Sequence, residues 1–243
     1  MNLVFDLGGV VFRWRPDEFL PRLAPQRAST AEAARRFADD FFQGFRGDWG
    51  EFDRGVIEAG TLAGRIGERT GMDVGEARAL IDAIARELVP MPDTVALLRR
   101  LRGEGPRLFY LSNMPGSYAH HLETTHDVFG IFERGLFSCR VGLIKPEPAM
   151  FGRAAADFGA PASELVLIDD VQANVDAAMA AGWQAIRFDD AQQCERDLRA
   201  RGLVRSADWS GCGGPPTMPA MESIRTSEPA ATVQPPRFEE GSS

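Results

Sequence analysis

The chain begins Met1-Asn2-Leu3-Val4-Phe5-Asp6-Leu7-Gly8-Gly9, a short apolar run followed by an acid and a pair of glycines. A short apolar run bounded by turn residues is typical of a buried strand, and paired glycines favour a turn. We therefore predict a strand over 2–6 that ends at Asp6. Ligands of open parallel sheets bind at the carboxyl ends of the strands, so Asp6 is a candidate functional residue.

Beyond residue 90 the apolar pattern alternates between helical and strand periods. This alternation is typical of a parallel sheet covered by helices on both faces. The sequence therefore predicts an α/β fold with a doubly wound parallel sheet. The expected strands are 107–111, 136–139, 164–168 and 184–188, and the expected helices are 93–102, 116–123, 148–158, 171–181 and 190–201.

Between the first strand and this series lies a block with helical periodicity and no convincing strand. Its best helices are predicted at 28–45, 55–69 and 73–88. We expect a core made of residues 1–15 and 89–204, with residues 16–88 inserted as a small helical cap and prolines at the hinges. The last segment, 205–243, is rich in Pro, Gly, Ser and Thr and is expected to be a disordered tail.

Composition excludes several classes of function. The 243 residues carry a formal net charge of -8, so the basic surface of a nucleic-acid-binding protein is not expected. No apolar run approaches the roughly 18 residues that span a bilayer. The three cysteines have no metal-site spacing, and their odd number without a signal peptide suits the cytoplasm. We expect a cytoplasmic enzyme with a small-molecule partner, whose oligomeric state is left open.

Only one of the 27 basic residues is a lysine, Lys145, and all the others are arginines. The ammonium group of lysine is compact and differs from guanidinium in shape and donor geometry. A chain that uses arginine everywhere else has retained lysine at this one position, so Lys145 is a candidate functional residue.

Four separate segments bring polar groups to the same predicted sheet edge: Asp6, Ser112-Asn113, Lys145 and Asp169-Asp170. Three neighbouring carboxylates would repel one another, but they could stay ionised around Mg²⁺, which prefers oxygen ligands. A hydroxyl, an ammonium group and the backbone amides near Gly8 could then hold a phosphate. This combination favours phosphoryl transfer.

The same segments resemble, in order, the four motifs of the haloacid-dehalogenase-like hydrolases. With a helical block after the first strand, the chain resembles the subfamily that carries a helical cap, and within it the glucose-1-phosphate phosphatases and related sugar-phosphate phosphatases. The motif segments are Phe5-Asp6-Leu7-Gly8-Gly9-Val10-Val11, Leu111-Ser112-Asn113, Gly142-Leu143-Ile144-Lys145-Pro146-Glu147-Pro148 and Ile168-Asp169-Asp170-Val171-Gln172-Ala173-Asn174.

The resemblance implies a nucleophile and a metal site. Asp6 would attack phosphorus and form an aspartyl-phosphate, which splits the reaction into two steps. Mg²⁺ would be held by the Asp6 carboxylate, the Gly8 carbonyl and Asp170, with Asp169 bound directly or through water. Asn174, on the same helix face as the second acid, could orient this motif.

The resemblance also implies how the phosphate is bound. Ser112 and the Asn113 amide would hold the transferring phosphoryl group, and Lys145 would bridge Asp6 and the phosphate. The cap would close over the site and exclude bulk water. The expected substrate is a small phosphate ester, with a sugar phosphate favoured.

One position departs from most phosphatases of the family. They carry a second Asp two residues after the nucleophile as general acid and base, whereas this chain has Gly8. General acid catalysis is typically worth about 10²–10⁴-fold. Either the enzyme is slow, or it acts on good leaving groups, or the cap supplies the acid. For the last case we hypothesise that the cap segment 47–55 faces the site, that Asp48 or Glu51 donates the proton, and that Trp49 lies near the substrate.

Two other functions stay open. A 2-haloacid dehalogenase also uses an Asp nucleophile and needs no acid at the Gly8 position, although it needs no metal either. A phosphate-binding relative without catalytic activity would also retain much of the site. Sensitivity to a metal chelator separates the first alternative from a phosphatase, and turnover separates the second.

Overall fold

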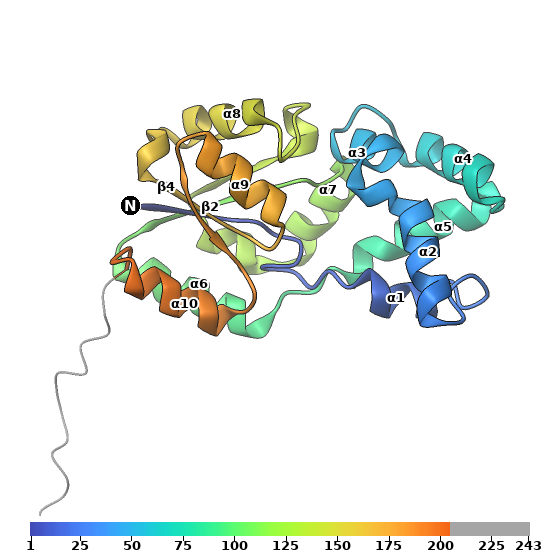
Figure 1. Ribbon diagram of the computed structural model, residues 1–243, viewed down its shortest axis with the longest axis horizontal. Coiled ribbons are helices and arrows are strands. Elements are labelled where there is room, and N and C mark those ends of the chain that lie inside the picture. Colours follow the sequence, from blue (N-terminus) through green and yellow to red (C-terminus); the bar gives the residue numbers. More distant parts are fainter. Residues whose placement is uncertain (205–243) are drawn as a thin grey trace, which may run out of the picture. The chain divides into compact units, whose positions relative to one another are not determined.

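Strand β1 lies at the centre of a five-stranded sheet with the order β3-β2-β1-β4-β5. Every neighbouring pair is parallel. This computed structural model describes residues 1–204, apart from the side chain of Phe45 (Figure 1). The strands are β1 (Asn2–Phe5), β2 (Arg107–Ser112), β3 (Arg134–Phe137), β4 (Leu165–Asp169) and β5 (Gln184–Arg187). The predicted doubly wound α/β fold is confirmed.

Helices cover both faces of this sheet, as Figure 1 shows. One face packs against α6 (Pro92–Glu104), α7 (Gly116–Thr125) and α10 (Ala191–Ala200), and the other against α8 (Pro148–Phe158) and α9 (Gln172–Ala180). Successive strand residues point to opposite faces. Accordingly, Leu3 and Phe5 join the first apolar cluster and Val4 joins the second, all fully buried.

A helical block stands between β1 and α6, where the cap is predicted. Its helices are α1 (Pro16–Leu23), α2 (Ala31–Phe42), α3 (Gly47–Asp53), α4 (Ala59–Thr70) and α5 (Val74–Ile84). The expected long helix 28–45 is shorter, because Thr30 caps its start and Gln43 takes a left-handed conformation at its end. We refer to residues 16–88 as the cap; its boundaries stay a prediction.

Short 3-10 helices join several of these elements. They are η1 (Gln43–Phe45), η2 (Ala85–Glu87), η3 (Asp127–Ile131), η4 (Ser138–Arg140) and η5 (Ala162–Glu164). η4 follows β3 directly and contacts the end of α3, where the Ser138 hydroxyl donates to the Asp53 carbonyl.

The two chain segments that connect the cap to the sheet run beside each other. The Arg13 N–H donates to the Val89 carbonyl at 2.9 Å, and the Met91 N–H donates to the Val11 carbonyl at 2.8 Å. Paired backbones of this kind restrict the directions in which a cap can move. Of the prolines expected at the hinges, Pro90 lies within this paired connection, whereas Pro16 and Pro92 begin the helices on either side of it.

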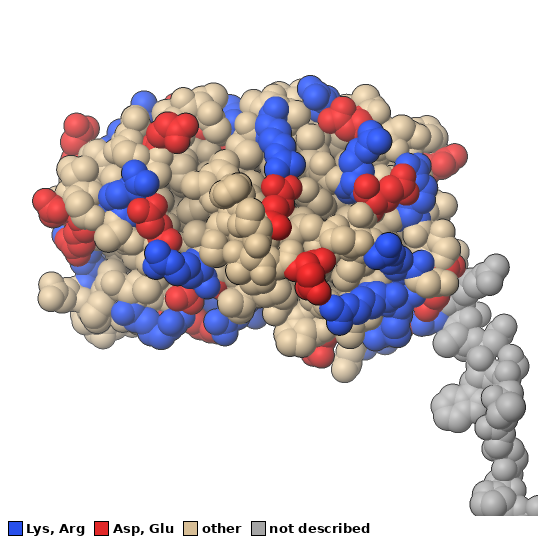
Figure 2. Space-filling view, turned by 180° about the vertical axis from the view of Figure 1, so that it is seen from behind, with Lys and Arg blue, Asp and Glu red and all other residues tan. Residues whose placement is uncertain are grey.

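The described surface carries charges of both signs. On the face shown in Figure 2, basic and acidic side chains are interspersed. Within residues 1–204, no helix combines the length and apolar character needed to cross a membrane. The tail expected at 205–243 lies outside the described residues.

Candidate active site

Three carboxylates meet where β1 and β4 end. Asp6 follows the last residue of β1, Asp169 is the last residue of β4, and Asp170 comes next. Because β1 and β4 are parallel neighbours, with Phe5 in register with Ile168, their carboxyl ends coincide. Oxygen atoms of the three acids lie within 4.8 Å of one another. The structure therefore brings together the acids that the sequence predicted as a set.

Lys145 lies between two of these acids. Its Nζ is 3.0 Å from Asp6 Oδ1 and 2.5 Å from Asp169 Oδ2, and the residue is only 3% exposed. Burial would lower the pKa of Lys145, but the Asp169 and Asp6 carboxylates outweigh it and raise that pKa above its ordinary value. The single lysine of the chain is thus a buried, charged group next to the predicted nucleophile.

Two asparagines fix the positions of these charged groups. The Asn113 amide donates to the Lys145 carbonyl at 2.9 Å and accepts from the Lys145 N–H at 2.8 Å. The Asn174 amide donates to both oxygens of Asp169, at 3.0 and 3.1 Å. Asn174 thus orients its motif as expected. The Asn113 side chain positions the lysine loop, and its predicted contact with the phosphoryl group stays a prediction.

The acids fit a divalent cation. Among the residues that the structure describes, the buried Oδ1 of Asp170 has no hydrogen-bond partner. Burial raises the pKa of Asp170, and so does the neighbouring Asp169. A cation bound by these oxygens would supply the missing partner and favour the charged form. Asp170 also lies against the Gly9 backbone, where an added Cβ would be 2.4 Å from its Oδ2.

Asp6 is a buried carboxyl in a crowded acidic site. Burial raises its pKa to about 7; Lys145 opposes this effect, and the Asp169 and Asp170 charges add to it. One ammonium group cannot offset three carboxylates. A further positive charge would therefore stabilise the ionised form of Asp6, and the neighbouring carboxylate oxygens are suitable ligands for a cation.

A cavity of about 230 Å³ opens over these groups, and Gly8, Ser112 and Asn113 line it with Asp6, Lys145 and Asp170. Ser112 is 1% exposed. The remaining wall is largely apolar and comes from both the core and the cap, and the cap also contributes the charged residues Arg46 and Asp53. Its larger apolar residues are Trp14, Trp49, Leu88, Met114, Tyr118 and Ile144.

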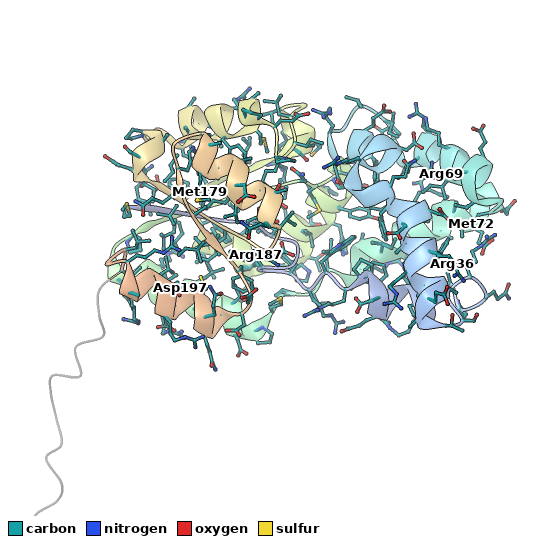
Figure 3. The ribbon with its side chains drawn as sticks, in the orientation of Figure 1. Arg36, Arg69, Met72, Met179, Arg187 and Asp197 are labelled. Carbon is teal, nitrogen blue, oxygen red and sulfur yellow. The ribbon has the colours of Figure 1, made fainter. Side chains whose placement is uncertain are left out.

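Trp49 lies in this wall, as the sequence suggested, while the two acids proposed for proton transfer do not. Asp48 bonds to Arg65 at 2.9 Å and to Arg69 at 2.5 Å, and Glu51 bonds to Arg65 at 2.6 Å. Figure 3 labels Arg69 within the cap. Burial raises the pKa of Asp48, but the two arginines outweigh this effect and lower that pKa below its ordinary value. This arrangement does not support Asp48 or Glu51 as the acid, because neither residue lines the cavity.

A different acid of the same segment does reach the cavity. Asp53, at the end of α3, lines the cavity and is 5% exposed. Burial raises the pKa of Asp53 well above its ordinary value, and the charge of Asp6 raises it further. Helical spacing carried the signal, because Asp53 is four residues after Trp49 and residues four apart share a helix face. Because Trp49 was expected near the substrate, the same helix face would have indicated Asp53 as the acid that reaches the cavity.

Comparison with known proteins supports the architecture. The solved structure of a haloacid-dehalogenase family enzyme of Bacteroides thetaiotaomicron, in complex with magnesium and inorganic phosphate, superposes with a TM-score of 0.62 at 23% identity, covering 77% of this chain and 93% of that one. An L-2-haloacid dehalogenase gives a TM-score of 0.65 at 18% identity, covering 82% and 98%. At these identities, the likeness shows the fold.

Sequence relatives add information about enzyme class. The sesquiterpene phosphatase astK of Aspergillus oryzae is 26% identical over 196 residues, which cover 81% of this chain and 93% of the relative. An enolase-phosphatase of Erwinia tasmaniensis is 31% identical over 102 residues, covering 40% and 43%. These phosphatases agree with the predicted class, a phosphoric monoester hydrolase, whereas the narrower sugar-phosphatase subgroup stays a prediction. Residues 2–182 match the haloacid dehalogenase-like hydrolase family, and the chain belongs to this family of hydrolases.

Proposed function

We propose that this protein is a Mg²⁺-dependent phosphatase that hydrolyses a small phosphate ester with a largely apolar organic group. The observation that carries the proposal is the shared cavity, in which Asp6, Lys145 and Asp170 stand beneath a wall of aromatic and aliphatic side chains. The charged floor suits a phosphate, and the wall suits a hydrocarbon.

The Asp6 carboxylate is the nucleophile of this mechanism. It attacks phosphorus, the bond to the ester oxygen breaks, and an aspartyl-phosphate forms on Asp6. Lys145, 3.0 Å from Asp6 Oδ1, neutralises charge between the nucleophile and the phosphoryl oxygens. The Ser112 hydroxyl donates a hydrogen bond to one of those oxygens. Water then cleaves the aspartyl-phosphate.

Mg²⁺ would be held by Asp6, the Gly8 carbonyl and Asp170. Asp169 would contribute less directly, because Lys145 and Asn174 already occupy its oxygens. When bound, the cation neutralises the phosphate charge and orients the phosphoryl group for attack. The protein holds the three carboxylates close together and keeps Lys145 positively charged.

The apolar wall favours an alkyl or isoprenoid phosphate over a sugar phosphate. Sugar sites need several hydrogen-bonding groups for the hydroxyls, since an unpaired buried polar group is costly. The cavity wall instead presents two tryptophans, Trp14 and Trp49, with Leu88 and Met114. A relative named a sesquiterpene phosphatase, which aligns over 81% of this chain, supports the same substrate class.

The test is a turnover panel with farnesyl phosphate, glucose-1-phosphate, p-nitrophenyl phosphate and a 2-haloacid, each with Mg²⁺ and with EDTA. We expect phosphate release from farnesyl phosphate that needs Mg²⁺ and that is lost in Asp6→Asn. Glucose-1-phosphate should have a kcat/KM at least tenfold lower.

Each other result assigns a different function. Preference for glucose-1-phosphate would replace the apolar substrate class by the sugar phosphate that the sequence favours. Halide release without metal would identify a dehalogenase. Mg²⁺ binding by calorimetry without any turnover would identify a phosphate-binding relative. The Glu51→Gln variant, altered outside the cavity, serves as the matched control for loss of a carboxylate.

A further inference from the structure

Asp53 is the one cap acid in the cavity wall of the described chain. It ends α3, and Trp49 one turn earlier lines the same cavity. Within residues 1–204, no lysine or arginine forms an ion pair with it. Asp48, by contrast, is paired with two arginines. Asp53 therefore lines the cavity without an ion pair of its own, although Arg46 of the cap and Lys145 line the same cavity.

The backbone of Asp53 is attached to the core. Its carbonyl accepts a hydrogen bond from Ser138 Oγ at 2.5 Å, and the same Oγ accepts from the Met114 N–H at 2.8 Å. Ser138 begins η4, directly after β3. The end of α3 is thus positioned by the same core segments that carry the catalytic residues.

The two residues after Asp53 strengthen this attachment. Arg54 donates to both carboxylate oxygens of Glu147, at 2.8 and 2.6 Å. Gly55 packs so closely on η4 that an added Cβ would lie 2.9 Å from the Cys139 carbonyl, and its φ is +75°. Three consecutive cap residues therefore contact the core, which fixes the backbone at Asp53 relative to the core.

The surroundings of Asp53 favour its protonated form. Burial raises its pKa, and the nearby Asp6 charge adds to the effect. Tyr118, whose ring packs 5.9 Å from Phe52, is an aromatic neighbour of the same cavity. A carboxyl kept neutral by an apolar site can donate a proton near neutral pH.

We propose that Asp53 is the general acid and base of this enzyme, supplied by the cap in place of the side chain absent at Gly8. This inference rests on the phosphatase function proposed above. In the first step, Asp6 bonds to phosphorus, the P–O ester bond breaks, and the Asp53 proton goes to the departing ester oxygen to give an alcohol.

The second step restores both acids. Water attacks the phosphorus of the aspartyl-phosphate, and one proton of that water passes to the Asp53 carboxylate. Hydrogen phosphate leaves, and Asp6 is again a carboxylate. The net reaction consumes one ester and one water and yields one alcohol and one phosphate, with no other reactant.

Leaving-group dependence tests this role. An alkoxide is a poor leaving group that needs a proton, whereas p-nitrophenolate departs without one. For Asp53→Asn we expect kcat/KM with farnesyl phosphate to fall about 10²–10⁴-fold and kcat/KM with p-nitrophenyl phosphate to fall less than tenfold. Glu51→Gln should change neither value by more than about twofold.

A rapid-mixing experiment gives a second, independent readout. Asp53→Asn should release a burst of p-nitrophenolate equal to the enzyme concentration, followed by slow turnover, because the second step has lost its base. Equal losses with both substrates, or no loss with farnesyl phosphate, would overturn the role of Asp53. Failure of the wild-type enzyme to hydrolyse any ester would instead overturn the phosphatase function itself.

Discussion

Arg54 of the cap and Glu147 of the core form an ion pair with two hydrogen bonds, at 2.6 and 2.8 Å. Glu147 lies two residues after Lys145, and its carboxylate also accepts from the Ile144 N–H at 3.3 Å. The pair therefore joins the end of α3 to the loop that carries the lysine. A contact across these two parts couples the position of the cap to that of the Lys145 loop.

Breaking this pair should impair catalysis more than stability. Arg54→Ala should lower kcat/KM about tenfold, because Asp53 and Lys145 lose a shared support. The side chains are 26% and 38% exposed, so solvent screening limits the coupling energy between them to about 0.5–1 kcal/mol. A double-mutant cycle with Glu147→Gln, followed by denaturant unfolding, measures that energy. Additive effects on kcat/KM would show that the pair does not act as a unit.

Lys145→Arg should lower kcat at least about 10²-fold, although it keeps the charge. The Lys145 side chain between Asp6 and Asp169 is almost fully buried, and a planar guanidinium differs from ammonium in size and donor directions. Steady-state kinetics measure the loss, and circular dichroism checks the fold. Arg153→Lys, on the exposed face of α8, is the matched control. Wild-type activity in Lys145→Arg would refute the argument from the lone lysine.

Asn174→Ala should weaken the response to Mg²⁺. Asn174 donates to both oxygens of Asp169, and groups that orient metal-site acids typically contribute 10–100-fold to metal affinity. We therefore expect the Mg²⁺ concentration for half-maximal activity to rise about 10–100-fold. Isothermal titration of Mg²⁺ without substrate provides a readout that does not depend on turnover. An unchanged affinity would assign Asn174 a purely structural role.

The sequence was sufficient to predict the sheet and which polar residues gather at its edge. Strand ends at Asp6 and Asp169 were visible as apolar runs followed by acids, and parallel topology then required them to meet. Contacts of the Asn113 amide were not predictable in this way. Its bonds to the Lys145 backbone join segments 32 residues apart, and no local period encodes such a pairing.

Prediction was weakest in the cap, where several acids compete within one short segment. Asp48, Glu51 and Asp53 are chemically alike, and only their partners distinguish them. Arg65 and Arg69, both on the next helix α4, form ion pairs with Asp48 and Glu51. The remaining indication in the sequence is helical spacing: Asp53 is four residues after Trp49 and lies on the same helix face.

Asp53→Asn should stabilise the protein while it impairs catalysis. The folded state raises the pKa of Asp53 above its ordinary value of 3.8, so at pH values well below 3.8 both states are protonated and the two proteins differ little. As pH rises, the unfolded chain loses this proton while the folded chain retains it, and wild-type stability falls. Asn avoids that loss. We expect a melting temperature about 2–4 °C higher at pH 7.5, which corresponds to about 1 kcal/mol.

That comparison is best made by calorimetry at pH 4.5 and pH 7.5 without added metal. The difference between the variants should grow with pH, and Glu51→Gln should show no such growth. A gain that is equal at both values would mean that Asn stabilises α3 by a route other than the proton of Asp53.

Gly8→Asp should partly restore the activity that Asp53→Asn loses. Gly8 lines the cavity, and a Cβ added there would meet no atom within 4 Å, so a side chain can enter the site from the core. A carboxyl at this position could exchange protons with the ester oxygen. We expect kcat/KM of the double variant with farnesyl phosphate to be at least tenfold above that of Asp53→Asn, and its p-nitrophenolate burst to diminish. Gly8→Asn in the same background controls for size without an acid. Equal activity of these two double variants would contradict the view that a proton donor is what Asp53 supplies.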